Sequence, residues 1–130
     1  MVNLNEFMKQ LSYEMELEQP LAAQMSGVYT LPLDENLYIV ISTGDEGLSF
    51  TSDVCKCPTV KREEFLTKMM HANLFGQGTS EAILGLTKNG EKITLSRHVH
   101  HEIDYKEFSE ILEDFINTVD YWADEVRVFK

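Results

Sequence analysis

Apolar residues recur at the spacing of an α-helix in three segments of the chain, and the first segment lies at its start. Asn3 can cap this helix, with Glu6 as its capping-box partner. The helix is predicted to run to about Glu18, because Pro20 disfavours helical backbone in the residue before it. Its apolar positions are Leu4, Phe7, Met8, Leu11 and Met15.

Two further helices are predicted in the middle and at the end of the chain. Thr59 can cap the second helix, and Gly76 is a typical stop signal after it. Asp104 can cap the third helix, which is predicted to extend to Val126 with Glu107 in its first turn. The apolar positions of the second helix are Phe65, Leu66, Met69, Met70 and Leu74. Those of the third helix are Phe108, Ile111, Leu112, Phe115, Ile116, Val119, Ala123 and Val126.

Strands are predicted over residues 28–33, 37–42 and 48–54, and short turns should join them into an antiparallel meander. Pro32 is expected at a strand end or on a sheet edge, because it has no N–H to donate. The middle strand is almost entirely apolar, which is typical of a strand covered on both faces. Two more strand-like runs flank Asn89-Gly90, a strong hairpin signal, and they cover residues 82–87 and 92–96.

The predicted order is helix, three strands, helix, two strands, helix, within a single domain of residues 1–130. This order predicts an α+β fold in which helices pack on an antiparallel sheet. Tyr38, Ile39, Val40 and Ile41 cannot all point into one core, because successive strand residues face opposite sides. Some of them are therefore expected to meet a second subunit or a bound peptide.

Composition and charge narrow the class of partner. The chain has 130 residues, 43% of them hydrophobic, with 11 basic and 22 acidic side chains and a formal net charge of −11. A field of that sign repels a phosphate backbone, so no nucleic-acid partner is predicted. No stretch is apolar and long enough to span a membrane, and the first residues lack the pattern of a secretory signal. Because Cys55 and Cys57 are too close for an unstrained disulfide, the sequence indicates a reduced, cytoplasmic protein.

Candidate chemistry is sparse. His98, His100 and His101 with Asp104 form the one metal-like cluster of the sequence, which keeps a metal-dependent enzyme open as an alternative. The Cys55-x-Cys57 spacing is not that of a zinc knuckle. The glycine-rich run 76–79 lacks the Gly-Lys-Ser/Thr signature and follows a helix, so it is not a phosphate loop. We therefore predict no enzyme activity, no metal and no cofactor.

Three stretches in the second half of the chain form one pattern. They are Met69-Met70-His71-Ala72-Asn73-Leu74-Phe75-Gly76-Gln77-Gly78-Thr79, then Ala82-Ile83-Leu84-Gly85-Leu86 with Ile93-Thr94-Leu95-Ser96-Arg97, then Asp104-Tyr105-Lys106-Glu107-Phe108 with Phe115-Ile116 and Trp122. With the element order, the length and the acidity, this pattern resembles the class I chaperones of bacterial type III secretion, the Tir-chaperone-like (CesT) family. The likeness covers the whole chain and is strongest from Phe65 to Trp122.

The resemblance implies a homodimeric virulence chaperone in the bacterial cytoplasm. Such a chaperone holds the N-terminal segment of one or more secreted effectors in extended form and delivers it to components of the secretion apparatus. On this basis the second helix and the hairpin's first strand are expected to build the dimer, through Phe65, Met69, Met70, Leu74, Ile83 and Leu86. The first helix and the outward sheet surface are expected to bind the effector, through Leu4, Met8, Leu11, Leu31, Leu33, Tyr38, Val40, Phe50 and Leu95.

The residues themselves allow such a mechanism, because an extended peptide can add to an exposed strand edge and fill apolar pockets. The net negative charge would steer basic effector segments toward the protein. A peptide-binding or regulatory α+β module with no role in secretion remains open as the other alternative.

Overall fold

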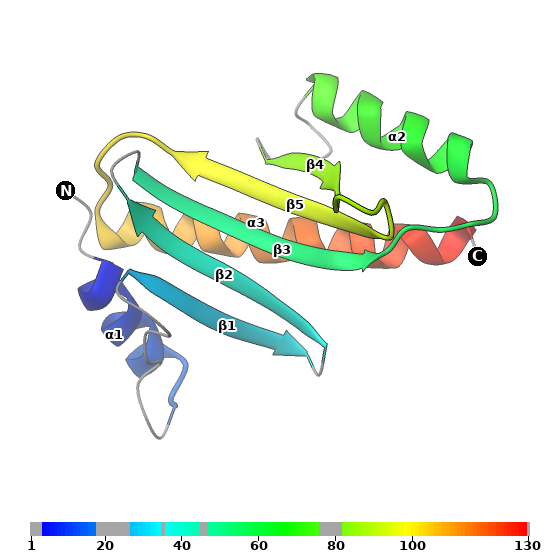
Figure 1. The fold of residues 1–130 in the computed structure, drawn as a ribbon. Helices are drawn as coiled ribbons and strands as arrows, with labels where there is room; N and C mark the ends of the chain where they lie inside the picture. The colour runs from blue at the N-terminus through cyan, green and yellow to red at the C-terminus, as the bar shows by residue number, and fades with distance from the viewer. Residues whose placement is uncertain (1–3, 18–26, 35, 45–46, 76–81, 130) are drawn as a thin grey trace.

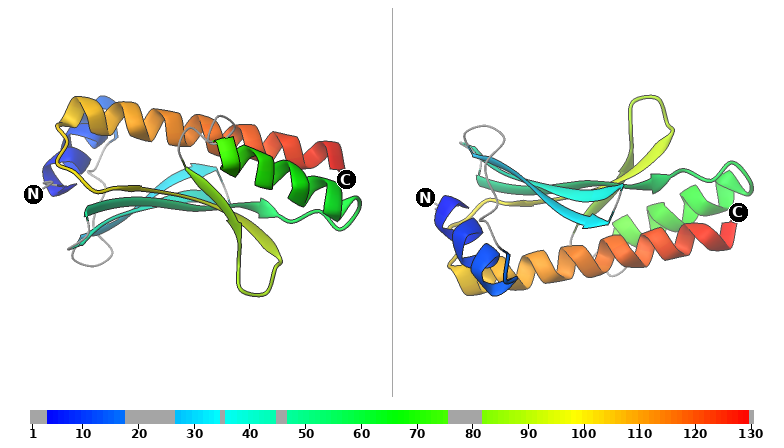
Figure 2. Two further views of the ribbon diagram at one scale, coloured as in Figure 1. Left: turned by 90° about the horizontal axis from the view of Figure 1, so that it is seen from above. Right: turned by 90° about the horizontal axis from the view of Figure 1, so that it is seen from below.

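Five antiparallel strands form one sheet, and the helices lie on one of its faces (Figures 1 and 2). The computed structural model describes residues 4–17, 27–34, 36–44, 47–75 and 82–129. The order of elements is the predicted one. The elements are α1 (Leu4–Glu14), β1 (Val28–Asp34), β2 (Leu37–Gly44), β3 (Gly47–Lys56), α2 (Arg62–Phe75), β4 (Ile83–Leu86), β5 (Lys92–Val99), α3 (Tyr105–Glu125) and the 3-10 turn η1 (Val126–Phe129).

The strand order in the sheet is β1-β2-β3-β5-β4. The first three strands form the predicted meander, and β4 and β5 form the predicted hairpin. The hairpin joins the meander through β5, and β5 pairs with β3 along almost the whole length of both strands. Pairing through β5 places β4 at one edge of the sheet and β1, which carries Pro32, at the other.

The strands alternate between a buried and an open face. Ile39 and Ile41 of β2 are 0% exposed and lie in the core, whereas Tyr38 is exposed and Val40 half-buried on the opposite face. The protomer by itself therefore covers only one face of this apolar strand, and contact of the other face with a second subunit or a bound peptide stays a prediction. The helices all lie on one side of the sheet (Figure 2), so the second face of β2 has no layer above it among the described residues.

Helix α1 ends at Glu14, four residues before the predicted end at Glu18. The backbone N–H of Leu17 donates to the Ser12 carbonyl, and the N–H of Glu16 donates to the Tyr13 carbonyl. These two bonds, with Glu16 in the left-handed region at a φ of 56°, form a Schellman motif. This local closure stops the helix well before Pro20 can act. The predicted cap, Asn3, lies outside the described residues.

The other two helices begin differently from each other. Helix α2 starts at Arg62, after Lys61 with a φ of 55°, so the prediction that Thr59 caps it was wrong. Its end at Phe75 agrees with the predicted stop at Gly76. The prediction for α3 is confirmed, because the Asp104 side chain accepts a 2.8 Å hydrogen bond from the Glu107 N–H.

Aromatic side chains hold α3 across the sheet. The Phe50 ring of β3 lies 5.9 Å from the Phe108 ring and 5.7 Å from the Phe115 ring. Phe7 of α1 packs 5.0 Å from Phe108, measured between ring centroids. Large apolar groups of this kind contribute most of the burial energy of a small core. The core therefore runs along α3, with α1 joined to one end of it.

Candidate binding surfaces

Helix α2 and strand β4 carry an exposed apolar surface. Met70 is 69% exposed, Leu74 76%, Ile83 59% and Leu86 38%. We call these four residues the α2–β4 surface. Exposed side chains of this size on neighbouring elements are typical of a protein interface. Leu86 shares the helix-covered face of β4 with the buried Leu84, whereas Ile83 lies on the open face, so the surface surrounds this sheet edge from both faces.

The six residues expected at the dimer interface fall into two groups. Met70, Leu74, Ile83 and Leu86 form the α2–β4 surface, whereas Phe65 and Met69 are 0% and 5% exposed and lie in the core. Phe65 packs edge-on against Trp122 of α3, with ring centroids 6.0 Å apart. Phe65 and Met69 therefore anchor α2 within the protomer and are not on its surface.

Polar contacts fix α2 in place. Lys68 forms an ion pair with Glu125 near the end of α3. The Asn73 side chain makes two 2.8 Å hydrogen bonds to the backbone of Leu84: its amide nitrogen donates to the carbonyl, and its oxygen accepts from the N–H. These contacts hold the helix against both α3 and the edge strand, with Met70 and Leu74 facing outward.

The nine residues expected to contact an effector are also divided. Leu33 and Val40 are half-buried and Tyr38 is 47% exposed, so these three are accessible from outside the protomer. The other six side chains belong to the core and are at most 8% exposed. They are Leu4, Met8, Leu11, Leu31, Phe50 and Leu95. Periodicity could not separate Tyr38 and Val40 from Phe50 and Leu95, because it does not say which strand face the helices cover.

The open face of the sheet is mainly polar. Ser42 of β2 and Ser49 of β3 are cross-strand partners whose hydroxyls lie 2.8 Å apart, and His98 of β5 continues the same row. The next row contains Thr30, Val40, Thr51 and Ser96. Hydroxyl groups can remain in contact with water, so this face does not require a second covering layer in the way an apolar face would.

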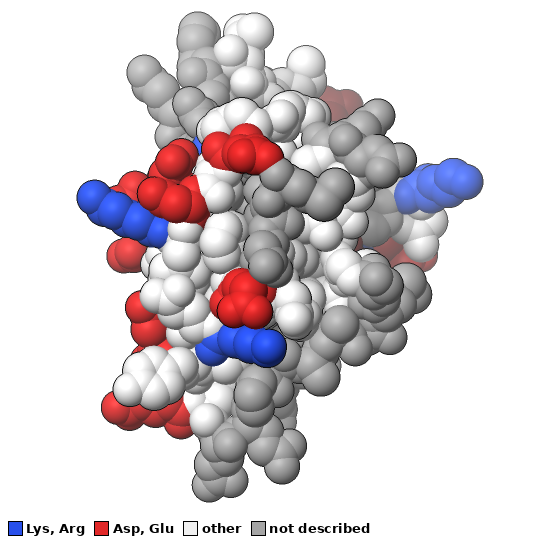
Figure 3. All heavy atoms as spheres, turned by 90° about the vertical axis from the view of Figure 1, so that its left-hand side faces the viewer, with Lys and Arg blue, Asp and Glu red and all other residues white. Residues whose placement is uncertain are grey.

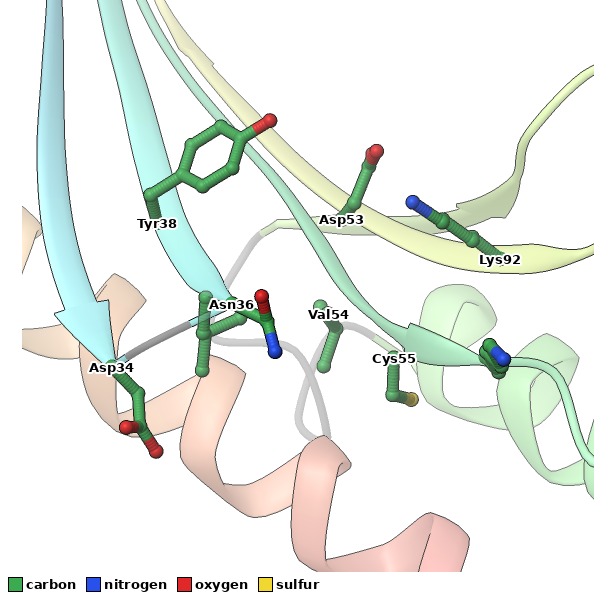
Figure 4. A pocket seen from close by; sticks show the side chains of 9 residues that line it. Asp34, Asn36, Tyr38, Asp53, Val54, Cys55 and Lys92 are labelled. Carbon is green, nitrogen blue, oxygen red and sulfur yellow. The ribbon is translucent and has the colours of Figure 1, made fainter.

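A pocket of about 680 Å³ opens at one end of this face. In Figure 4 the side chains of Tyr38, Asp53 and Lys92 project from the three neighbouring strands β2, β3 and β5. Asp34 and Lys56 also line the pocket, and Lys56 and Lys92 are direct cross-strand partners. With charges of both signs around a tyrosine, the pocket suits polar side chains of a partner. No local sequence signal predicts this pocket, because Lys92 joins it only through the pairing of β3 with β5.

The edge strand β1 exposes part of its backbone. The Thr43 N–H donates to the Gly27 carbonyl, which identifies this as a hydrogen-bonded pair of the antiparallel ladder. Hydrogen-bonded and non-hydrogen-bonded pairs alternate along an antiparallel ladder. Val28, Thr30 and Pro32 therefore belong to non-hydrogen-bonded pairs, and their peptide groups point away from β2. Pro32 has no N–H, and the outward donors of this edge therefore come from Val28 and Thr30.

The histidine cluster does not assemble a ligand set in the described residues. The His98 and His100 rings are stacked with their centroids 6.1 Å apart. In the described part of the chain, no three His, Cys, Asp or Glu side chains come together as ligands for a metal ion. The metal-dependent alternative consequently has no geometric support there. Cys55 is half-buried in the pocket wall and Cys57 is buried beyond the end of β3, and both are thiols.

Acidic side chains dominate the helical side of the molecule. In Figure 3 they gather on the side where the helices lie. The exposed acids of α3 are Glu107, Glu110, Glu113, Asp114, Asp120 and Asp124.

At the start of α3 the Tyr105 hydroxyl donates a 2.7 Å hydrogen bond to Glu14 of α1. Burial raises the pKa of Tyr105 to about 12, and the hydrogen bond and negative charge of Glu14 add to the rise. Among the described residues, no helix is long and apolar enough to cross a membrane.

Comparison with known proteins agrees with this architecture. A Chlamydia pneumoniae protein, CPj0713/CpB0740, is 23% identical over 129 residues, which cover 98% of both chains. A chain of the ExsC–ExsE complex superposes with a TM-score of 0.75 at 14% identity, covering 93% of this chain and 91% of that one.

Two other complexes contain the same fold. A chain of the HopA1–SchA chaperone–effector complex has a TM-score of 0.71 at 13% identity, with 93% of both chains covered. A chain of the ExoU–SpcU complex from the type III secretion system of Pseudomonas aeruginosa has a TM-score of 0.65 at 11% identity, covering 95% of this chain and 93% of that one. The model of the Tir chaperone protein (CesT) family matches residues 4–123, and the chain therefore belongs to this family.

Proposed function

We propose that this protein is a type III secretion chaperone. It binds the N-terminal segment of one or more effectors in extended form in the bacterial cytoplasm, keeps the segment secretion-competent and brings it to the secretion apparatus. The family match over residues 4–123 carries the proposal. The similarity in fold to a chain of the HopA1–SchA chaperone–effector complex supports it. The proposed activity is binding alone, without a catalytic step.

The proposed dimer forms through the α2–β4 surface. Four apolar side chains that are 38–76% exposed support this assignment, since water contact with them is unfavourable. Phe65 and Met69 contribute indirectly, because they fix the helix that presents Met70 and Leu74. A second copy would cover the same residues on both partners, as a twofold interface requires.

The proposed effector segment adds to the edge of β1. The outward peptide groups of Val28 and Thr30 offer two donors and two acceptors to an incoming strand. Leu33, Tyr38 and Val40 are the accessible members of the expected contact set, and all three lie on β1 or its neighbour β2. The net charge of −11 favours clients with basic segments and speeds their encounter with the protein.

The energetics permit binding without nucleotide. Ordering a disordered segment of this kind costs roughly 2–5 kcal/mol and buries about 1,000–3,000 Å². Apolar burial contributes about 25 cal/mol per Å², so the gross gain exceeds the ordering cost before other association costs are counted. Energy from ATP is therefore not required to hold the client.

The test is co-expression of the tagged protein with candidate effectors, followed by purification through the tag. We expect the N-terminal segment of an effector to be retained and to be lost when that segment is deleted. Thr30→Pro removes an outward N–H of β1 and should abolish retention, whereas Thr30→Ala, the matched control, keeps the N–H and should retain the client. If neither wild type nor Thr30→Ala retains any effector segment, the proposed function is wrong.

A further inference from the structure

The two edges of the sheet differ in what they offer to another strand. On β4, the Thr87 N–H donates to the Lys92 carbonyl, so Thr87 and Lys92 form a hydrogen-bonded pair. Hydrogen-bonded and non-hydrogen-bonded pairs alternate along the ladder. The pairs Gly85–Thr94 and Ile83–Ser96 are therefore also hydrogen-bonded, whereas Leu84–Leu95 and Leu86–Ile93 are not. The peptide groups of Leu84 and Leu86 consequently point outward, away from β5, as a free edge would present them to another chain.

The Asn73 side chain occupies the outward peptide group of Leu84 completely. It donates to the carbonyl and accepts from the N–H, each at 2.8 Å. A side-chain amide carries one acceptor oxygen and one donor nitrogen, like a peptide group, so it can replace an incoming strand at this position. Only one orientation of the amide satisfies both bonds.

We propose that Asn73 closes the β4 edge against strand addition. A strand that paired with β4 would need the Leu84 peptide group, which belongs to the second residue of this four-residue strand. A second copy of the chain would then meet the side chains of the α2–β4 surface and not the β4 backbone. This last consequence rests on the proposed dimer, whereas the closure itself depends only on the Asn73 contacts.

The comparison of the edges supports this assignment. At β1 the outward position 32 is a proline, which removes one donor, but the outward peptide groups of Val28 and Thr30 remain. At β4 the sequence Ile-Leu-Gly-Leu is apolar, short and uncharged, the kind of edge that tends to pair with other chains. A side chain that blocks strand addition therefore prevents more unwanted pairing at β4 than it would at β1.

The first test is amide hydrogen exchange of two neighbouring residues. In the wild type the Leu84 amide should exchange slowly although it faces the edge. In Asn73→Ala it should exchange roughly three- to tenfold faster, the range that corresponds to the loss of one hydrogen bond. The Gly85 amide, bonded to β5, should not change. Asn117→Ala, at an exposed asparagine on α3, is the matched control and should leave both amides unchanged.

The second test is the mass of the variants by light scattering across protein concentration. Asn73→Ala should form species larger than the wild type at high concentration. Adding Leu86→Pro, which removes the next outward N–H, should suppress these species, whereas adding Leu86→Ala should not. Both second changes delete the Leu86 side chain, and they differ in the backbone N–H and in the φ angle that the proline ring fixes.

The outcomes separate this inference from the proposed function. Equal acceleration of Leu84 and Gly85 in Asn73→Ala would mean a general loss of stability and would overturn the inference, as would no acceleration of Leu84. Equal suppression of large species by Leu86→Pro and Leu86→Ala would also overturn it. A monomeric wild type, or one that retains no effector, would contradict the proposed function and leave the exchange result at Leu84 interpretable.

Discussion

Helices α1 and α2 have similar apolar content but use it differently. In α1 the apolar stripe of Leu4, Met8 and Leu11 is at most 8% exposed and packs entirely inside the protomer. In α2 Phe65 and Met69 are buried, but Met70 and Leu74 are 69% and 76% exposed. Consecutive helical residues lie about 100° apart around the axis, so Met70 cannot share the face of Met69.

The difference between α1 and α2 indicates that a second apolar stripe on a helix is available to bind another molecule. One stripe is sufficient to attach a helix to its own sheet, as in α1. Helix α2 has two stripes with the same four-residue spacing, one formed by Phe65 and Met69 and the other by Met70 and Leu74. The first binds α2 to α3 and the sheet, so the second is available for another molecule. Substitutions in the buried and in the exposed stripes test this division.

Phe65→Ala should be the most damaging change in either helix. It removes a 0% exposed ring that packs against Trp122, and the cavity should lower the free energy of unfolding by about 3–5 kcal/mol. Denaturant unfolding followed by circular dichroism gives this value. A loss as small as that of a surface substitution would show that α2 is not anchored through this ring.

Met8→Ala tests the buried stripe of α1. Its side chain is 0% exposed, so the change should lower the free energy of unfolding by about 2–5 kcal/mol. The molecular mass at concentrations where the variant is folded should remain that of the wild type. A change in mass without a change in stability would place α1, and not α2, at the subunit interface.

Met70→Glu and Leu74→Glu test the exposed stripe of α2. Each places a charge on an apolar surface that the proposed dimer buries, so the dimer should dissociate to monomers. The unfolding free energy of the protomer should change by only about 0.5 kcal/mol, as for an ordinary surface site. Light scattering and denaturant unfolding of the same samples provide both readouts. Asn117→Glu, on the exposed side of α3, is the matched control and should remain dimeric.

Tyr105→Phe should have the smallest effect, and it concerns the attachment of α1. It removes the hydroxyl that donates to Glu14, which should cost about 0.5–1.5 kcal/mol at neutral pH. Because the pKa of Tyr105 is raised from 10.0 to about 12 in the folded state, its neutral form stabilises the fold below pH 10. This contribution should be lost as the pH rises from 10 to 12.

The pH dependence is measured as the difference in unfolding free energy between wild type and Tyr105→Phe. The difference should be constant from neutral pH to pH 10 and shrink between pH 10 and 12, since the unfolded chain loses the tyrosine proton first. A difference that grew over this range would contradict the raised pKa. Contributions from the groups that the two proteins share cancel in this difference.

The sequence by itself determined the number, order and type of the α-helices and strands, but not the 3-10 turn η1. Helical periods, the Asp104 cap and the Asn89-Gly90 turn are local signals, because they depend on residues a few positions apart. Local signals failed at two helix boundaries. The Schellman closure at Glu16 and the left-handed Lys61 before α2 involve residues without a strong turn preference.

Only the tertiary structure decided which apolar residues face outward. Leu31, Phe50 and Leu95 looked equivalent to Tyr38 and Val40 in the sequence, but the helices cover a single face of the sheet and bury the first three. Leu33 shares the face of Leu31 and is only half-buried, at the irregular end of β1. Likewise, nothing in the sequence pairs Asn73 with Leu84, because that contact forms when α2 packs beside β4. Hydrophobic patterns state that a residue avoids water, whereas the neighbour that excludes the water depends on how distant segments pack.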